Sequence, residues 1–448
     1  MARSYRTQGG WEFASVVIQC LVRAAAILIA VAAIADNVLA QGVFLPSIGP
    51  INQSIGGAAV AAPIDSSGAL AWNPAAISGL KSNEMQFGVG LVMPQAQLSS
   101  TLDPGSILGV LPTTTLTGSN KSNSGSTPVP AISLVHHVGD TGVSFGIGVF
   151  AVGGFGVNYP SSTTNPVLLP QPAGLGRVFS QASIVQIIPT ASYAVTDKLS
   201  IGVAPVVDMA QLSADPLFLA PPNAGIYGPG NGTLMSWGGG FQTGVYYITD
   251  HNWHFGASYK SQQWIEPFRY NSNNAAGFPV SASTQFNLPS ITSIGAAYNG
   301  FNRLLLTGDV RYYDYAGATG FNQSGFNANG AVAGLGWRSV WSVAVGGQYE
   351  ATRRLTLRTG YTYGDNPIPN SQSMFNVASA LIIQNWYSVG GSYRLAQNVA
   401  FNIAYSHGFQ NHITGPIVNP ALGGALPGTS VTSTISADII NAGFSVLY

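Results

Sequence analysis

Charge is scarce in this sequence of 448 residues. Charged residues make up 7% of the chain, against about 25% in ordinary soluble domains. The 16 basic and 16 acidic residues give a formal net charge of zero, which argues against nucleic acid as a partner. So few charges would leave a soluble protein of this length with little to keep it dispersed. The composition therefore favours a protein whose surface lies in a membrane.

Long apolar runs are also missing beyond residue 40. A membrane-spanning helix needs about 18 or more nearly unbroken apolar residues, whereas Gly, Ser, Thr and Asn interrupt this chain every few positions. The remaining way to cross a bilayer is a closed β-barrel, whose strands alternate and never look apolar in a long window. The sequence therefore predicts an all-β fold, a transmembrane antiparallel β-barrel.

Cysteine is nearly absent, and the single Cys20 lies in a segment with the features of an export signal. Three arginines and the apolar run AAAILIAVAAIA precede small residues, VLA (38–40), that suit a cleavage site. A lipoprotein signal would need a small residue before the cysteine, and Gln19 fits poorly. We therefore predict a signal peptide over residues 1–40 and a mature chain that begins at Gln41. That chain has no disulfide and no thiolate metal site.

From residue 84 onward the chain alternates with the period of a strand. About fourteen segments of about ten residues follow one another, the length that a tilted strand needs to cross a bilayer. In WHFGASYK (253–260), Trp253 and Phe255 share one face with Tyr259. The second face is rich in Gly, Ser, Ala and Asn rather than Lys and Glu, which suits a narrow lumen with packed contents. We predict that residues 84–448 form the barrel.

The connections between these segments are unequal in length. Short links such as VTDK (195–198) and EATRR (350–354) alternate with loops of about fifteen to thirty residues, as in outer-membrane barrels with short periplasmic turns. The chain ends with Phe444 and Tyr448 on one face of the last strand. A terminal aromatic fits the signal by which the barrel assembly machinery recognises its substrates. The predicted location is the bacterial outer membrane, in contact with lipid and lipopolysaccharide.

The stretch DSSGALAWNPAAISGL (65–80) follows neither pattern. It has no helical stripe and no alternation, and its Asn-Pro pair would interrupt a helix or a strand. Residues 41–83 as a whole are too apolar to hang in the periplasm, and the lumen of a barrel this size would otherwise be an open channel. We therefore predict that residues 41–83 fold into a plug, or hatch, inside the barrel.

The hatch and several barrel segments resemble those of the FadL/TodX (OmpP1) family of outer-membrane transporters of long-chain fatty acids and other hydrophobic compounds. The Asn-Pro-Ala motif of that family's hatch is matched by Asn73, Pro74 and Ala75. LTLRTGYTYGDNPIPNSQ (355–372) is a second specific match, and weaker ones lie at 187–205, 253–261 and 389–409. The resemblance implies fourteen strands, passive uptake of hydrophobic small molecules, and exit through an opening beside a kinked third strand. It implies no cofactor.

Two adjacent glycines interrupt the third predicted strand, VSFGIGVFAVGGFGVNY (143–159). Gly153 and Gly154 cost backbone entropy in a strand, and such pairs often mark a bulge or a bend. With Phe155 they lie where the family's kink would be, and we predict the lateral opening there. The alternative is that the glycines only make room for the hatch.

Ionisable residues on the predicted inner face are few. Because unpartnered burial of a charge is costly, pairing among them or hydrogen bonds to the hatch is the first interpretation, and substrate contact the second. The cations could bind a fatty-acid carboxylate, whereas a neutral aromatic hydrocarbon needs none. The residues that alternation places there are Asp208, Lys260, Asp309, Arg311 and Arg358.

Motifs for catalysis and metal binding are weak. GVSFG (142–146) matches the nucleophile pattern G-x-S-x-G, but that pattern needs a strand–turn–helix elbow, and here it begins an alternating strand. HNWH (251–254) has two histidines but no accompanying carboxylate cluster. A lipid-modifying enzyme would need a convergent Ser/His or His/Asp set, so we expect no enzyme activity and no metal. A general porin is the stronger alternative, but this chain is too poor in charge to supply charged lumenal rings.

Overall fold

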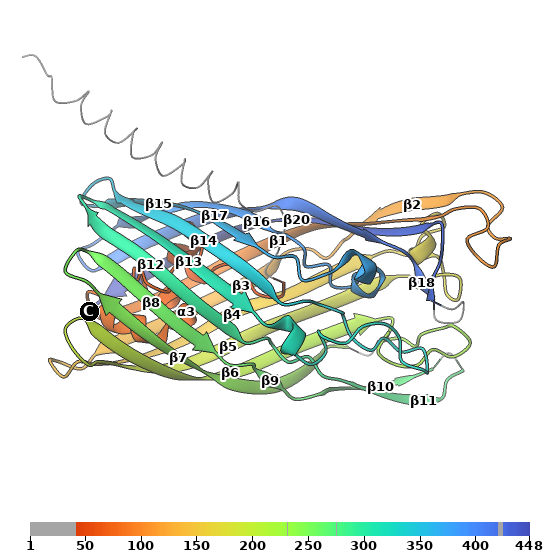
Figure 1. Cartoon of the computed structure of the whole chain (residues 1–448), viewed down its shortest axis with the longest axis horizontal. Helices are drawn as coiled ribbons and strands as arrows, with labels where there is room; N and C mark the ends of the chain where they lie inside the picture. Colours follow the sequence, from red (N-terminus) through yellow and green to blue (C-terminus); the bar gives the residue numbers. More distant parts are fainter. Residues whose placement is uncertain (1–41, 231, 275, 420–423) are drawn as a thin grey trace, which may run out of the picture. The chain divides into compact units, whose positions relative to one another are not determined.

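Fourteen antiparallel strands form the wall of a closed barrel in the computed structural model (Figure 1). The structure describes residues 42–448 except 231, 275 and 420–423, so the predicted signal peptide lies outside the described residues. Strands adjacent in sequence pair with each other, and β1 closes the wall by pairing with both β20 and β3. The wall strands are β1 (Glu84–Leu102), β3 (Thr127–His137), β4 (Val143–Tyr159), β5 (Val178–Ala194), β6 (Leu199–Asp215), β7 (Leu234–Ile248), β8 (Trp253–Lys260), β12 (Ile291–Phe301), β13 (Leu304–Tyr313), β14 (Val340–Glu350), β15 (Leu355–Gly364), β16 (Asn385–Arg394), β17 (Val399–Gly415) and β20 (Thr429–Leu447). The prediction of an all-β antiparallel barrel of about fourteen strands is confirmed.

The two ends of the barrel differ as the connection lengths predicted. Short turns join the strands at the end where the chain terminates, and long loops emerge at the other end (Figure 1). No helix among the described residues is long and apolar enough to cross a membrane. The loops contain short strands and 3-10 turns, namely β2 (Leu116–Lys121), η2 (Pro166–Leu168), β9 (Trp264–Ile265), β10 (Phe268–Asn273), β11 (Pro279–Thr284), η3 (Tyr315–Gly317), η4 (Asn370–Gln372), η5 (Met374–Asn376), β18 (Val418–Asn419) and β19 (Gly424–Ala425).

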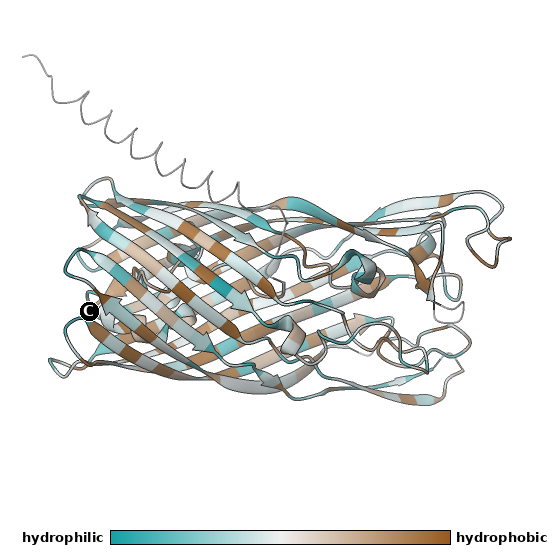
Figure 2. Cartoon of the chain, in the orientation of Figure 1, coloured by the Kyte–Doolittle hydropathy of each residue, from teal (hydrophilic) through white to brown (hydrophobic). Residues whose placement is uncertain are grey.

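Along the wall strands, large apolar side chains on the outer face alternate with small or polar side chains on the inner face. Along β8, Trp253, Phe255 and Tyr259 are exposed, whereas Ser258 and Lys260 are buried. Figure 2 shows the same alternation of brown and pale positions over the wall strands. An outer face of this kind matches the lipid-facing band of a membrane barrel, with the second face turned toward the lumen.

Residues 42–83, here called the internal segment, are almost entirely buried and pack against the inner face of the wall. Helix α2 (Gly49–Ser54) contacts β1, β3, β15, β16, β17 and β20; α3 (Ser66–Trp72) contacts β1, β3, β4 and β5; and η1 (Pro74–Gly79) contacts β4, β5, β6 and β7. Local capping explains these short elements. Asp65 begins α3 by accepting a hydrogen bond from the backbone N–H of Gly68, and Pro74 occupies the first turn of η1.

Glycine on the inner face of the wall lets the internal segment approach the strands closely. A Cβ atom at Gly256 would lie 2.0 Å from the carbonyl oxygen of Val60, and one at Gly244 would lie 2.0 Å from Oδ1 of Asn73. Real Cβ atoms do not approach other atoms this closely. The small inner face that the sequence indicated is therefore shaped to its contents.

Candidate functional site

The ladder on one side of β1 is interrupted near the middle of the wall. β1 pairs with β3 from Glu84 to Val92 and with β2 from Gln97 to Leu102, which leaves a break between the two ladders. On the β2 side of the break, Ser122 N donates to the carbonyl of Ala96 at 2.8 Å. Across the break, β4 pairs with β3 only as far as Phe150.

The free edge of β4 beyond this point is occupied by the start of the internal segment. Leu45 N donates to the Val152 carbonyl at 2.8 Å, and Gly154 N donates to the Val43 carbonyl at 3.1 Å. Phe44 thereby forms a bridge with Gly153. The first described residues of the chain thus act as a short extra strand beside the interruption.

The predicted pair of glycines lies at a bulge in β4. The register between β4 and β5 shifts between Ala151 and Gly153, and Gly154 has φ +152°, which side chains rarely adopt. A Cβ atom at Gly153 would lie 2.1 Å from the Val43 carbonyl oxygen. The glycines therefore both accompany an irregular strand and make room for the internal segment. The lateral opening predicted at this place stays a prediction.

A cavity opens beside the bulge, enclosing about 1040 Å³ of empty space, counting the part open to solvent. Its lining is apolar: Thr127, Ser183 and Ser379 supply the polar side chains among the described lining residues, and none of these residues is charged. The lining comes from the internal segment, from the wall strands β1, β3, β4, β5, β16 and β20, and from the loop before β16. It comprises residues 42–46, 92, 94, 127–129, 151, 153–157, 182, 183, 379–381, 383, 386, 435 and 437.

Sequence reasoning missed the part of this lining that comes from the loop before β16. Ala380, Leu381 and Ile383 reach the cavity from that loop, and Trp386 reaches it from the start of β16. The signal was an apolar run, ASALII (378–383), inside a long loop. Phe155, by contrast, lines the cavity beside the predicted glycines.

The Asn-Pro-Ala motif lies apart from the cavity, where the internal segment meets β7. The Asn73 side-chain amide donates to the carbonyls of Val60 at 2.8 Å and Val245 at 3.0 Å, and its Oδ1 accepts from Ala75 N at 3.1 Å. Pro74 and Ala75 are buried. The motif therefore joins two parts of the internal segment to each other and to the wall.

Asn73→Ala is expected to weaken that junction. Removal of the amide leaves the buried Val60 carbonyl and the Ala75 N–H without their partners, which costs about 1–3 kcal/mol. The wall ladders do not involve this side chain, so the heat-dependent gel mobility of the folded barrel should be unchanged. Entry of small polar antibiotics into cells should rise. Unchanged entry would show that the contact is dispensable for sealing.

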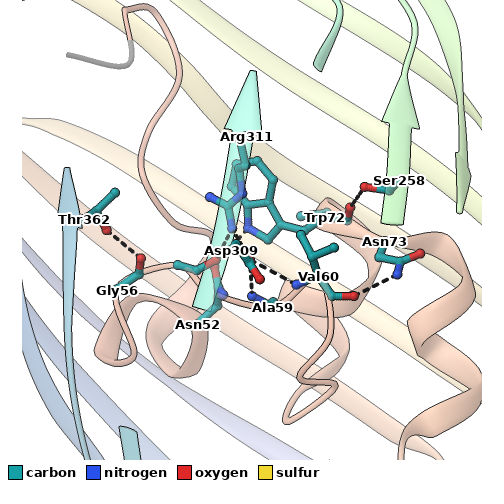
Figure 3. Close-up of polar contacts among 12 residues, drawn as sticks. Asn52, Gly56, Ala59, Val60, Trp72, Asn73, Ser258, Asp309, Arg311 and Thr362 are labelled. Atoms are coloured by element: carbon teal, nitrogen blue, oxygen red, sulfur yellow. Dashed lines mark hydrogen bonds and ion pairs between the residues drawn. The ribbon is translucent and has the colours of Figure 1, made fainter. Parts of the chain in front are cut away.

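An ion pair inside the barrel holds the middle of the internal segment (Figure 3). Asp309 Oδ2 accepts from Arg311 Nη2 at 2.7 Å and from the backbone N–H groups of Ala59 at 2.8 Å and Val60 at 3.1 Å. Arg311 also donates to the Gly57 carbonyl at 2.6 Å. Both charged side chains are buried, and they bind chain segments about 250 residues away in sequence.

One cation–π contact and two hydroxyl hydrogen bonds extend this junction around the lumen. The Arg311 guanidinium carbon lies 3.6 Å from the centroid of the Trp72 ring, a cation–π contact in a desolvated place. The hydroxyl of Ser258 donates to the Trp72 carbonyl at 2.5 Å, and that of Thr362 donates to the Gly56 carbonyl at 2.6 Å (Figure 3). Strands β8, β13 and β15 thus all bind the internal segment between Gly56 and Trp72.

The other predicted inward charges are also buried, but they bind wall residues. Lys260 Nζ donates to Gln186 Oε1 at 3.0 Å, and Gln186 Nε2 donates to Asp208 Oδ1 at 2.8 Å. Arg358 donates to Gln348 at 2.6 Å and to Ser392 at 2.7 Å. None of the five predicted inward charges is among the described residues that line the cavity.

Within the internal segment, Asp65 is the one buried carboxyl. Burial raises the pKa of Asp65 to about 7, and the nearby Glu84 carboxylate acts in the same direction. Glu84 in turn accepts a hydrogen bond from Ser66 N at 2.8 Å. The segment is therefore held by a polar contact to β1 at the start of α3.

The C-terminal residues lie on the outer face of the barrel end. Phe444 is exposed and packs against Phe401, with ring centroids 5.4 Å apart. The exposed Tyr448 stacks on His136 at 6.1 Å. Their predicted role as an assembly signal stays a prediction.

Known proteins share this architecture at low sequence identity. The fold is similar to that of the P. putida toluene transporter TodX (TM-score 0.66, 18% identity, covering 90% of this chain and 99% of that chain). It is also similar to a Pseudomonas aeruginosa FadL homologue (0.69, 16%, 91% and 99%) and to the Ralstonia pickettii toluene transporter TbuX (0.64, 17%, 90% and 99%).

Sequence comparisons lead to the same group of proteins. The chain is 23% identical over 177 residues to the long-chain fatty acid transport protein of Salmonella typhi, a match that covers 35% of this chain and 39% of that relative's length. These relatives are transporters, in agreement with the expectation that the protein is not an enzyme. The family described as "Outer membrane protein transport protein (OMPP1/FadL/TodX)" matches residues 31–446, and the chain therefore belongs to this family of outer-membrane proteins.

Proposed function

We propose that this protein is a passive outer-membrane channel for hydrophobic small molecules and that it prefers uncharged ones, such as aromatic hydrocarbons, to fatty acids. The observation that carries this proposal is the apolar cavity beside the interrupted wall. Such a cavity offers an apolar solute an apolar surface, so the solute does not need to enter bulk water. No energy source or cofactor is required.

The internal segment, with the preceding Gln41, is the hatch of this channel. Its contacts with strands around the whole wall and its buried ion pair support a fixed plug that closes the straight route through the lumen. A general porin would need an open, charged lumen instead. The family assignment also favours the hydrophobic-compound transporter.

The solute leaves sideways, through the wall next to Gly153, Gly154 and Phe155. Three features support this route: the break between the β2 and β3 ladders, the bulge in β4 and the cavity that adjoins both. The outer-membrane lipid and lipopolysaccharide around the barrel would receive the solute. Insertion by the barrel assembly machinery, with Phe444 and Tyr448 as the signal, belongs to the same proposal.

The preference for uncharged solutes follows from where the cations lie. A carboxylate placed in an apolar cavity without a partner loses several kcal/mol of hydration. Lys260, Arg311 and Arg358 are hydrogen-bonded elsewhere and are not among the described lining residues. The cavity thus accepts a neutral hydrocarbon chain or ring without a compensating charge.

The test compares uptake of radiolabelled toluene and oleate by cells with and without the protein. We expect protein-dependent toluene uptake to exceed that of oleate by at least about tenfold, the factor that 1.4 kcal/mol gives. Equal or faster oleate uptake would refute the preference, and the absence of protein-dependent uptake of either solute would refute the transport proposal itself.

A further inference from the structure

Four arginines lie together on three neighbouring short turns of the barrel. Arg303 lies between β12 and β13, Arg353 and Arg354 lie between β14 and β15, and Arg394 ends β16. Backbone hydrogen bonds join these turns to the adjacent chain: Arg394 N donates to the Arg354 carbonyl at 2.8 Å, and Glu350 N to the Arg303 carbonyl at 2.9 Å. The four residues are called the arginine arc.

The side chains of the arginine arc are exposed and have no partner. Within the described part of the chain, no salt bridge or side-chain hydrogen bond involves any of them. Glu350 is the single acidic residue on the same turns, so the arc side has a net charge of +3. This concentration stands out in a chain with 7% charged residues.

The opposite half of the same end carries the opposite charge. The turns after β3, β5 and β7 hold three aspartates and one lysine, a net charge of −2, and Lys198 is already paired with Asp250 at 2.7 Å. The aspartates are Asp140, Asp197 and Asp250. The short-turn end of the barrel therefore has a positive half, which contains the arginine arc, and a negative half, which contains the three aspartates.

Aromatic and apolar side chains on the outer face set the depth of the arc in the membrane. Phe301, Tyr349, Tyr393 and Leu395 are all exposed next to the four arginines. Aromatic rings of barrels gather at the boundary between hydrocarbon and headgroups. The guanidinium groups therefore lie at the level of the headgroups of the periplasmic leaflet.

We propose that the arginine arc binds anionic glycerophospholipids of the periplasmic leaflet through their phosphate groups. Guanidinium pairs with phosphate oxygens through two parallel hydrogen bonds, and clustered cations at a membrane surface attract anionic lipid. The occupant is a lipid because the arc stands at headgroup depth beside an exposed aromatic band, where lipid is always present.

The test uses native mass spectrometry of the purified mature protein in nanodiscs that contain equal amounts of phosphatidylglycerol and phosphatidylcholine. The unmodified protein should retain more phosphatidylglycerol than phosphatidylcholine. In the variant R303Q/R353Q/R354Q/R394Q this ratio of retained lipids should fall, by about fivefold for each arginine removed at low salt. Excess soluble glycerol phosphate should not displace the lipid from the unmodified protein. Folding is checked by the heat-dependent gel mobility.

A matched control removes four exposed cations outside the arc, K81Q/K121Q/K198Q/R269Q, so the net charge changes equally. This variant should keep the preference. If the arc variant does not fold, the variant R353Q/R354Q replaces it, and the ratio of retained phosphatidylglycerol to phosphatidylcholine should then fall about twenty-fivefold. The proposal is overturned if an arc variant retains the preference, as it would if the arc served an acidic protein, or if the control loses it equally.

Discussion

Replacing Asp309 with alanine is expected to loosen the internal segment while the wall stays closed. The change leaves the N–H groups of Ala59 and Val60 without their acceptor and the buried Arg311 without its counter-ion. Breaking a buried pair in this way costs about 3–5 kcal/mol. The wall ladders run through backbone groups and should persist.

The measurement combines entry of small polar antibiotics into cells with the gel mobility of unboiled protein. Entry should rise severely, and the mobility of the folded barrel should be kept. The double variant Asp309→Leu/Arg311→Met removes both charges, leaves none unpaired, and should leak less than the single variant. The role of the pair would be contradicted if antibiotic entry in the single variant equalled that in the natural protein. It would also be contradicted if antibiotic entry were higher in the double variant than in the single variant.

Gly156→Phe is expected to close the cavity and stop most uptake. Gly156 lines the cavity, and its added Cβ would meet only Ser180 O at 3.6 Å, an ordinary contact. The phenyl ring then occupies space that the solute needs. Overpacking costs about 1–3 kcal/mol, which corresponds to about 5- to 150-fold weaker solute binding.

Toluene uptake by cells measures the effect of this change, and Gly156→Ala serves as its control because one methyl group leaves the cavity open. The alanine variant should transport nearly as well as the natural protein. Antibiotic entry should be the same in both, since the internal segment is untouched. Normal uptake by a folded phenylalanine variant would place the route elsewhere and remove the cavity from the mechanism.

Alternation along single strands carried most of the sequence-based prediction. The third wall strand has the predicted bounds, Val143–Tyr159, because every second side chain must face lipid. The same rule placed Asp309 and Arg311 on the inner face. It could not name their partners, because Ala59 and Asp309 are 250 residues apart in sequence. The Asn-Pro pair likewise indicated an irregular element without revealing that Asn73 bonds to β7.

The cavity could be predicted only in part for a related reason. Gly153, Gly154 and Phe155 are recognisable within one strand, whereas the contribution of residues 379–383 depends on how a long loop folds back over the lumen. Loop positions follow no period, so no pattern in the sequence fixes them.

The close fit between the wall glycines and the internal segment limits how proteins of this kind can diversify. At Gly244, Gly256 and Gly346 the absent side chains are replaced by atoms of the internal segment, which lie 2.0–2.3 Å from where a Cβ would be. An internal segment transplanted from a relative with 16–18% identity would meet a wall shaped for different atoms. Substitutions in the wall and in the internal segment must therefore occur together, at positions that contact each other. The loop that covers the cavity meets the same constraint at Gly415, where the Asn370 carbonyl oxygen lies 1.9 Å from the position of a Cβ, so a new solute preference that arises in this loop must also keep its fit to β17.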